Sequence, residues 1–529
     1  MGIRGRGSPV TGTESNEPNE TNETNESNET DPVLVKSRIA SHRRKHRPVQ
    51  GRTTAIVVVA LVVLGVALVS AAVPEPSAEP AGPAGDGAAV SPAGAHASSI
   101  FCTTGSGLDA GSGAATTIVL VNTTHSAVHG TMATAVATTV GTPTPAAAPT
   151  VAVRKAVTVP PLGTISVTPA EGMPAGATAS TFAFSGGGVT GTAIISGPQG
   201  WSTAPCASAV SSQWDFAGGA TATGLLDLSL YNPTAAPTVV GATFLTANGN
   251  VLIPQEYQGI LLAPGQLVVE NLGAYVQNQA VVATLVRASS GSLVATELDQ
   301  MVVASGSGLA LMSGTPGPST TWRFAQTTAV QGGTVTLALA NPNVEPVTAL
   351  VTVGLSGASV EPRRVRIPAR TVASFTPSAT AGWPLGSPYS LTVSSSAPIV
   401  VGRTVVAPAS AASPQGGISP GATTTTEHWL VVGPGGPTSP AVAGATRQSL
   451  AVAVPGPSAV DVTVTRLDNG AVTARARVTG HGTVVFGPDR VGGLDPLVVT
   501  ASGPVTVEAD DGPSGAPGIV AQSGLPLGP

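Results

Sequence analysis

The chain has 529 residues, 42% of them hydrophobic, and a net charge of −5. Up to its one long apolar run it carries 9 lysines and arginines against 7 acidic residues, whereas the part beyond carries 14 against 21, a net charge of −7. An acidic surface argues against non-specific nucleic-acid binding, so we expect no nucleic-acid partner.

The long apolar run, Ala55–Val73, has no charge and no proline. At about 1.5 Å per residue a helix over it is roughly 28 Å long, close to the thickness of a bilayer. We therefore predict one transmembrane helix at residues 54–73. Seven basic residues lie in 36–52 and none follows the run before Arg154, which predicts a cytoplasmic N-terminus. The alternative is a cleaved signal peptide, for which Ser70-Ala71-Ala72 offers the small residues.

The segments on either side of this run have low-complexity compositions. Residues 1–53 carry an acidic Asn/Glu/Thr repeat and then the basic flank, and we predict a disordered cytoplasmic tail. Residues 74–97 are rich in proline, glycine and alanine and predict an extended tether. Both cysteines, Cys102 and Cys206, lie beyond the run, where an oxidising compartment favours a disulfide; two free thiols are the alternative.

A pattern recurs through the rest of the chain. Trp214, Trp322 and Trp429 open similar stretches at intervals of 108 and 107 residues, and each begins a series of short alternating runs between turn residues. Such runs are typical of antiparallel sandwiches. We predict an all-β fold of four Ig-like β-sandwich units at 98–212, 213–318, 319–425 and 426–529. The tryptophans should be core residues, and the stretches 305–320 and 407–426 should be linkers.

One hairpin can be predicted residue by residue. Residues 460–467 and 471–478 alternate around Asp468-Asn469-Gly470. A three-residue loop with Gly470 in the left-handed region pairs Val460 with Val478, and this register keeps one face apolar.

Together, the N-terminal anchor, the tether, the two-cysteine first unit and the tandem Trp-x-Phe stretches resemble an uncharacterised family of actinobacterial envelope proteins, domain of unknown function 5719. The resemblance covers most of residues 55–529. It implies a place in the cell envelope but no activity, and it provides no catalytic residues to carry over.

Motifs for chemistry are weak. The nucleophile-elbow pattern Gly417–Gly421 falls in a predicted linker, where the required strand and helix are not expected. His125 and His129 are predicted to lie in a loop and a strand, and Asp510-Asp511 is predicted to lie in a solvated turn. We therefore predict no catalytic residue, no metal site, no cofactor and no enzymatic activity; an envelope hydrolase or transferase is the least favoured class.

Two candidate binding features remain. Arg363, Arg364, Arg366 and Arg370 gather in an otherwise acidic region, where guanidinium groups suit an anionic wall polymer. A second set consists of aromatics outside the predicted core, suited to stacking on sugars: Trp201, Trp383, Tyr257, Tyr275 and Tyr389. The favoured function is a non-enzymatic, single-pass cell-membrane protein whose extracellular repeats act as a scaffold or adhesion-type module. The alternative is a carbohydrate or anionic wall-polymer binding module. Expected partners are the membrane and either cell-wall polysaccharide or other envelope proteins.

Overall fold

The structure is a computed structural model in which the chain divides into two compact units, Met1–Glu79 and Pro80–Pro529. It describes residues 87–104, 115–137, 153–169, 171, 177–197, 200–303, 306–325, 334–356, 360–377, 383, 388–406, 416–436, 439–440, 445–513 and 520–527. The predicted tail, the predicted membrane helix and the first part of the predicted tether lie outside these residues. Within them, no helix is both long enough and apolar enough to cross a bilayer.

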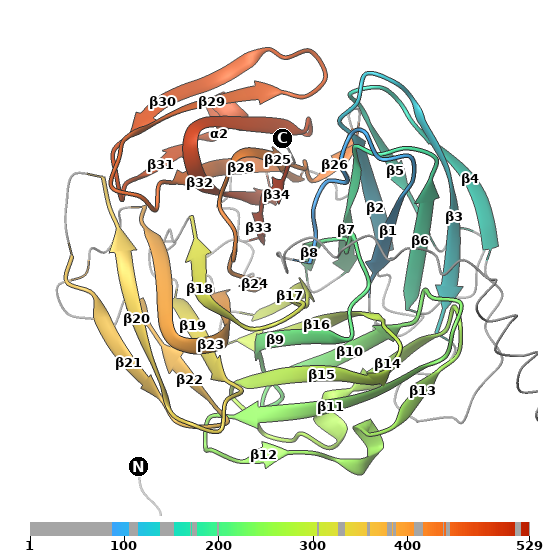
Figure 1. Ribbon diagram of the computed structural model, residues 1–529, viewed down its shortest axis with the longest axis vertical. Helices are drawn as coiled ribbons and strands as arrows, with labels where there is room; N and C mark the ends of the chain where they lie inside the picture. The colour runs from blue at the N-terminus through green and yellow to red at the C-terminus, as the bar shows by residue number, and fades with distance from the viewer. Residues whose placement is uncertain are drawn as a thin grey trace, which may run out of the picture. The chain divides into compact units, whose positions relative to one another are not determined.

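The second unit is all-β and built of small antiparallel sheets that occur in consecutive pairs (Figure 1). We call each pair a repeat, its "first sheet" the one that holds the first strand, and its "second sheet" the one that holds the last main strand. Repeat 1 contains β1 (Ser98–Thr103), β2 (Ala115–Asn122), β3 (Val128–Val136), β4 (Val153–Val159), β5 (Thr164–Val167), β6 (Thr178–Phe184), β7 (Val189–Gly197) and β8 (Gly200–Pro205). Its sheet orders are β1-β6-β3-β4 and β5-β2-β7-β8.

Repeat 2 follows the same plan with two added 3-10 helices. Its elements are β9 (Gln213–Gly219), β10 (Gly224–Tyr231), β11 (Thr238–Thr246), β12 (Val251–Leu252), η1 (Gln255–Tyr257), β13 (Ile260–Leu262), β14 (Leu267–Asn271), η2 (Leu272–Ala274), β15 (Val282–Ser290), β16 (Val294–Val303) and β17 (Gly306–Ser313). Its orders are β12-β11-β15-β9, with β13 also on β11, and β14-β10-β16-β17.

Repeat 3 has one strand that runs through both of its sheets. Its strands are β18 (Ser319–Phe324), β19 (Thr334–Asn341), β20 (Val347–Gly354), β21 (Arg363–Ile367), β22 (Thr371–Phe375), β23 (Ser390–Val406) and β24 (Gly416–Pro420). The 17-residue β23 pairs with β18 and β20 in the first sheet, and with β19 and β24 in the second. It therefore takes the place of two separate strands in repeats 1 and 2.

Repeat 4 repeats this arrangement around a second 17-residue strand, β32. Its elements are β25 (Thr426–Val431), β26 (Gly435–Gly436), β27 (Ser439–Pro440), β28 (Ala445–Ala453), β29 (Val460–Arg466), β30 (Val472–Val478), β31 (Thr483–Phe486), α2 (Pro488–Val491), β32 (Leu497–Pro513), β33 (Val520–Ser523) and β34 (Leu525–Pro526). In the predicted hairpin Val460 faces Val478, and Gly470 has a φ of 68°, so the predicted register is confirmed.

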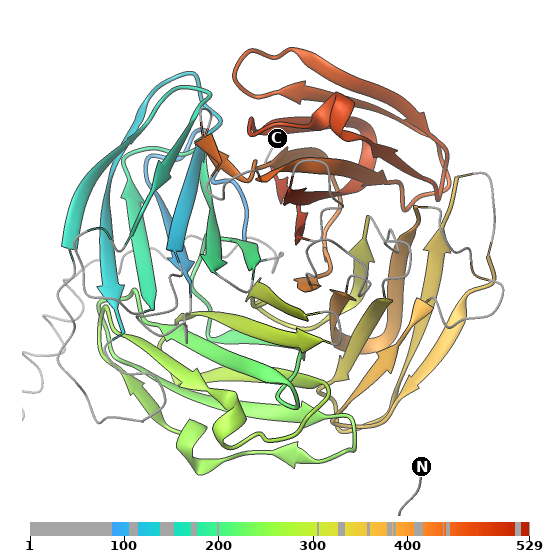
Figure 2. The same cartoon turned by 180° about the vertical axis from the view of Figure 1, so that it is seen from behind.

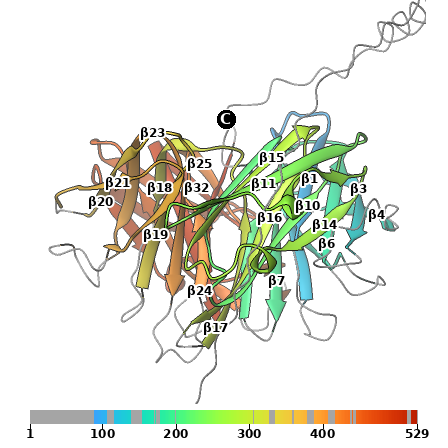
Figure 3. The ribbon, with the colours of Figure 1, turned by 90° about the horizontal axis from the view of Figure 1, so that it is seen from below.

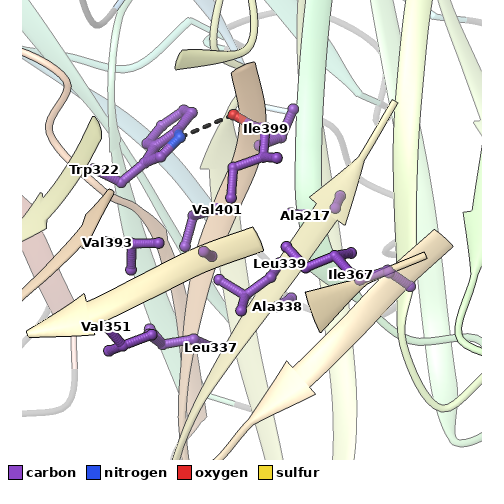
Figure 4. Packing of buried hydrophobic residues seen from close by; sticks show 14 of the residues in the cluster. Ala217, Trp322, Leu337, Ala338, Leu339, Val351, Ile367, Val393, Ile399 and Val401 are labelled. Atoms are coloured by element: carbon purple, nitrogen blue, oxygen red, sulfur yellow. Dashed lines mark hydrogen bonds between the residues drawn. The ribbon is translucent and has the colours of Figure 1, made fainter. Parts of the chain in front are cut away.

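The recurring tryptophans occupy equivalent places in the cores of repeats 2, 3 and 4. The indole N–H groups of Trp214, Trp322 and Trp429 donate hydrogen bonds to the backbone carbonyls of Leu293, Ile399 and Val505 at 2.8, 2.9 and 3.1 Å. Each tryptophan is at most 1% exposed, and Figure 4 shows Trp322 in its cluster. A buried indole N–H needs such a partner, and the prediction that these residues belong to the core is confirmed.

A second recurring feature is an asparagine at the end of β2, β10 or β19. The side-chain amides of Asn122, Asn232 and Asn341 each donate to the carbonyl four residues later, at 2.7–2.8 Å. Each side-chain oxygen also accepts a backbone N–H two residues on. This local geometry closes the same turn in three repeats and explains why the strands end in asparagine.

Neighbouring repeats pack second sheet against first sheet. Tyr231 and Val269 of repeat 2 share a core cluster with Ala179 of repeat 1, and repeat 3 packs in the same way on Ala217 and Leu285 of repeat 2. Ala451 and Ala453 of repeat 4 contact Ala325 of repeat 3. The contacts then close, because Val119, Ile194 and Trp201 of repeat 1 pack with Leu430 and Leu525 of repeat 4. The four repeats therefore contact one another cyclically (Figures 1 and 2).

The last main strands of the four repeats also contact one another in a cycle, β8 with β17, β17 with β24, β24 with β33 and β33 with β8. Figure 3 shows β17 beside β24. Both strands lie in stretches predicted to be linkers, so that prediction is wrong. The glycines that directly follow these strands lie in crowded places: a Cβ on Gly314 or Gly421 would lie 2.7 or 2.9 Å from the rings of Phe216 or Phe324.

The end of the predicted tether also differs from expectation. Ala88 and Val90 are 4% and 6% exposed, and the Val90 N–H donates to the Pro526 carbonyl at 3.3 Å. These residues belong to the cluster that joins repeats 1 and 4. Residues 87–90 are therefore packed structure, because the small apolar side chains of Ala88 and Val90 fill the closing interface.

Candidate functional site

The predicted disulfide between Cys102 and Cys206 is present. Cys102 lies on β1 and Cys206 directly follows β8, so the bond joins the first strand of repeat 1 to the end of its last. Both residues are buried in the core of that repeat. A structural disulfide indicates an oxidising, extracytoplasmic environment.

Three of the four clustered arginines, Arg363, Arg364 and Arg366, lie on β21, an edge strand of the first sheet of repeat 3. Ile367 faces the core with no exposed surface, whereas Arg364 and Arg366 are exposed on the opposite face. Across the strand pair, Arg364 lies beside Leu350 and Arg366 beside Thr348. Alternation along a strand separates the two sets of side chains.

The arginines differ in their partners. Arg363 lies 3.9 Å from the exposed carboxylate of Glu361. Arg370 sits in the turn before β22 with a φ of 52°. Among the described residues, no salt bridge involves Arg364, Arg366 or Arg370.

The proposed sugar-stacking aromatics are not a surface set. Tyr257, Tyr389, Trp201 and Trp383 are 1%, 4%, 5% and 7% exposed, so this hypothesis is corrected for all four. Trp201 is covered by repeat 4, Trp383 packs edge-on against Phe375, and the Tyr257 hydroxyl donates to the Asn271 carbonyl. Tyr275 alone of the five is exposed, at 48%, and its ring contacts Tyr257.

The residues of the weak sequence motifs lie in strands and turns. Ser419 of the elbow pattern lies on β24, and its hydroxyl accepts a hydrogen bond from Arg403 at 3.0 Å. His125 is exposed in a turn, and His129 on β3 bonds the Thr158 hydroxyl at 3.0 Å. In the described part of the chain, no group of three or more His, Cys, Asp or Glu side chains is placed to hold a metal ion.

Asp510 and Asp511 are not a solvated turn but part of β32, and Asp511 has no exposed surface. Burial raises the pKa of each carboxyl to about 7. The Asp511 carboxylate accepts a hydrogen bond from Gln522 at 2.7 Å, and Arg447 lies opposite it in the strand register. The turn prediction is wrong because the strand continues through both sheets.

A buried ion pair joins repeats 3 and 4. Arg403 on β23 and Glu508 on β32 are each 1% exposed, and the guanidinium donates to the carboxylate at 3.1 Å. The guanidinium also lies 5.0 Å from the centre of the Phe324 ring. Composition does not reveal this pair, because its two halves are about one repeat apart in the sequence.

Repeat 2 holds five further buried carboxyl groups that sequence reasoning missed: Asp215, Asp227, Glu270, Glu297 and Asp299. Burial raises the pKa of Glu297 to about 8 and the pKa values of Glu270 and Asp299 to about 7. Asp299 accepts a hydrogen bond from the backbone N–H of Ala220 at 3.0 Å. The available signal for buried carboxyl groups was the presence of charged residues inside the apolar run at 293–303.

The junction of repeats 3 and 4 contains a pocket of about 40 Å³. Repeat 3 contributes Arg323, Thr352, Ser390 and Thr392, and repeat 4 contributes His481 and Thr506, besides backbone and apolar groups. The Thr506 side chain is 1% exposed, and among the described residues its hydroxyl has no hydrogen-bond partner. The pocket is therefore rich in hydroxyl groups.

The fold and these sites define an all-β, repeat-built protein with one disulfide. No family model and no curated protein matches the chain. A solved structure described as Thermotoga maritima 1070 is 16% identical over 20% of this chain and 93% of that chain, with a TM-score of 0.19. A tetra-tandem repeat from the extending region of a large adhesion protein is 14% identical over 77% of this chain and 97% of that chain, with a TM-score of 0.10. Both likenesses are weak, and the resemblance to domain of unknown function 5719 stays a prediction.

Proposed function

We propose that this protein is a non-enzymatic scaffold of the cell envelope, attached to the membrane by the predicted helix at 54–73 and carrying tandem Ig-like sandwiches outside it. The observation that carries the proposal is the cycle of contacts among the four repeats. Repeats joined only in sequence can bend at each linker, whereas repeats that also close on themselves hold their surface loops at set positions.

Because the four repeats contact one another in a closed cycle, a closed scaffold agrees with the structure better than a linear one does. A linear string of sandwiches would provide reach, but here Trp201 of repeat 1 and Leu430 of repeat 4 share one core cluster. Such a body suits the presentation of several surfaces to envelope partners at once. The disulfide supports a location outside the cytoplasm.

Cross-linking in intact cells tests this function. We expect full-length protein cross-linked in the membrane to recover the same envelope proteins in repeated experiments. A variant with a disrupted closing interface, Trp201→Asp, should lose them while remaining in the membrane. Recovery of no consistent partner, or an undiminished set with Trp201→Asp, would refute the scaffold function.

A second candidate function, binding of an anionic cell-wall polymer, is favoured by one observation. Arg364 and Arg366 are exposed side by side on β21 without an ion pair among the described residues. Exposed guanidinium groups suit phosphate and carboxylate groups. Retention of the protein on purified cell wall, decreasing as salt rises, is the expected result; salt-independent retention would contradict it.

A further inference from the structure

We propose that a groove between repeats 3 and 4 binds an anionic polysaccharide, with a row of hydroxyl side chains at its inner end and Arg364 and Arg366 at its outer end. The inference rests on the second candidate function and specifies its site. By the groove we mean the pocket at the junction of the two repeats together with the adjoining outward face of the first sheet of repeat 3.

The strand register places the groove's side chains in rows. Arg323, Thr392 and Thr352 lie side by side across β18, β23 and β20, and all three line the pocket. These side chains face away from the core, because the alternate residues Trp322, Val393 and Val351 belong to the core cluster.

The next row continues the same face toward solvent. Thr321, Ser394, Leu350 and Arg364 lie side by side across four strands, and Arg366 follows beside Thr348. Ser394, Thr348 and both arginines are exposed. From Thr392 to Arg364 the face extends about 10 Å across two strand spacings and about 7 Å along the strands. A single sugar ring does not span this separation, whereas a short chain of sugars does.

The chemistry of the two ends selects the ligand. Hydroxyl side chains both donate and accept hydrogen bonds, as sugar hydroxyls require, and the Thr506 hydroxyl is buried in the pocket without a partner among the described residues. The guanidinium groups at the outer end require carboxylate or phosphate. A polymer with both groups, a polysaccharide that carries carboxylate or phosphate, matches the whole face.

The corresponding interface between repeats 2 and 3 is filled with apolar side chains instead. Leu285 lies opposite Asp215 in the strand register of repeat 2, and this position corresponds to that of Thr392 opposite Arg323 in repeat 3. Leu285 packs in the core cluster that it shares with repeat 3. Between repeats 3 and 4, the small cluster that spans the junction consists of three alanines with the half-buried Val485 packed against them. The polar composition of the junction between repeats 3 and 4 is therefore not required by the way repeats pack.

Repeat 4 offers a matched control. Arg475 and Arg477 occupy the places on β30 that Arg364 and Arg366 occupy on β21, six and four residues before turn residues that share a left-handed conformation, His481 and Arg370. In repeat 4, however, Arg477 pairs with the exposed Asp461 at 3.2 Å. Replacing Arg475 and Arg477 changes the net charge as much as replacing Arg364 and Arg366 does, but it leaves the groove intact.

Calorimetric titration of the full-length chain tests the groove. The probes are oligogalacturonate and dextran phosphate as the two anionic glycans, unmodified dextran as the neutral one, and poly-glutamate as an anion without sugar. We expect at least one anionic glycan to bind, and Arg364→Ser/Arg366→Ser to weaken it about tenfold or more. Thr392→Val should weaken it severalfold, and Arg475→Ser/Arg477→Ser should stay within about twofold of wild type. Circular dichroism should show all variants folded.

Several outcomes would overturn the groove. Poly-glutamate binding as tightly as the anionic glycans would contradict the requirement for sugar, and neutral dextran binding as tightly would contradict the requirement for an anion; either result would remove the anionic-polysaccharide assignment. Equal losses in the two arginine variants would mean a general charge effect. Suppose that cell wall retains the wild type in a salt-dependent manner and retains Arg364→Ser/Arg366→Ser and Thr392→Val to the same extent as the wild type. The groove is then not the binding site, whereas binding of a cell-wall polymer stands. If neither wall nor any probe is bound, both proposals fail.

Discussion

The ion pair between Arg403 and Glu508 provides a quantitative test of how repeats 3 and 4 are joined. Changing Arg403 to Met keeps an unbranched chain against Phe324 but leaves the Glu508 carboxylate, 1% exposed, without its cation. Removing one partner of a buried pair typically costs about 3–5 kcal/mol, because the remaining charge has lost its compensation. We expect a loss of that size in the free energy of unfolding at pH 8.

The same loss should shrink in acid. A carboxyl group that has lost its cation can bind a proton, and Asp510, whose pKa is held down in part by Arg403, is affected in the same direction. The Arg403→Met variant should therefore lose less stability at pH 5 than at pH 8. The double variant Arg403→Met/Glu508→Leu removes both charges and should lie closer to the wild type than Arg403→Met does.

Denaturant unfolding followed by tryptophan fluorescence measures these differences, since Trp322 and Trp429 are in the cores of the two joined repeats. Lys155→Met is the control, because Lys155 and Glu171 form an ion pair with side chains 56% and 72% exposed. Such a surface pair contributes only about 0–1 kcal/mol. A loss below about 1 kcal/mol for Arg403→Met, or no difference between pH 5 and pH 8, would contradict the buried-charge reasoning.

Three further outcomes are expected. Stability should fall from pH 5 to pH 8, because burial raises the pKa values of five carboxyl groups to about 7 or 8, so the folded state holds more protons than the unfolded state in this window; a denaturation midpoint that rises with pH would refute this. These groups are Glu270, Glu297, Asp299, Asp510 and Asp511. Replacing both cysteines by alanine should lower the unfolding free energy by up to about 4–5 kcal/mol, since the bond closes a loop with a sequence separation of 104; an unchanged denaturation curve would exclude that contribution. Trp322→Phe leaves the buried Ile399 carbonyl without its indole donor and should cost about 1–3 kcal/mol by the same assay, whereas a neutral result would mean that another donor replaces it.

Local pattern was sufficient for much of the fold. Strand alternation depends on which of two faces each residue takes, so the Val460–Val478 register followed from the residues of one hairpin. The recurrence of Trp322 and Trp429 indicated the repeats because a large side chain is needed at the same place in each core. The disulfide partners followed from having only two cysteines.

The sequence predicted only one part of the candidate site. The sequence pointed to Arg364 and Arg366, whose exposed face follows from alternation with Val365 and Ile367. The pocket that continues this face could not be predicted, because Thr392 and Thr506 come from different repeats and meet only when those repeats pack.

The sequence by itself determined the class of the fold, the repeat and its anchoring residues, because these depend on short periodicities and local turn chemistry. The tertiary structure decided everything that depends on contacts between distant segments. It placed Trp201 inside the closing interface rather than on the surface, and it made strands of glycine-rich stretches such as Gly416–Pro420. It also brought Arg403 to Glu508, since burial and charge pairing are properties of the packed repeats and not of either strand alone.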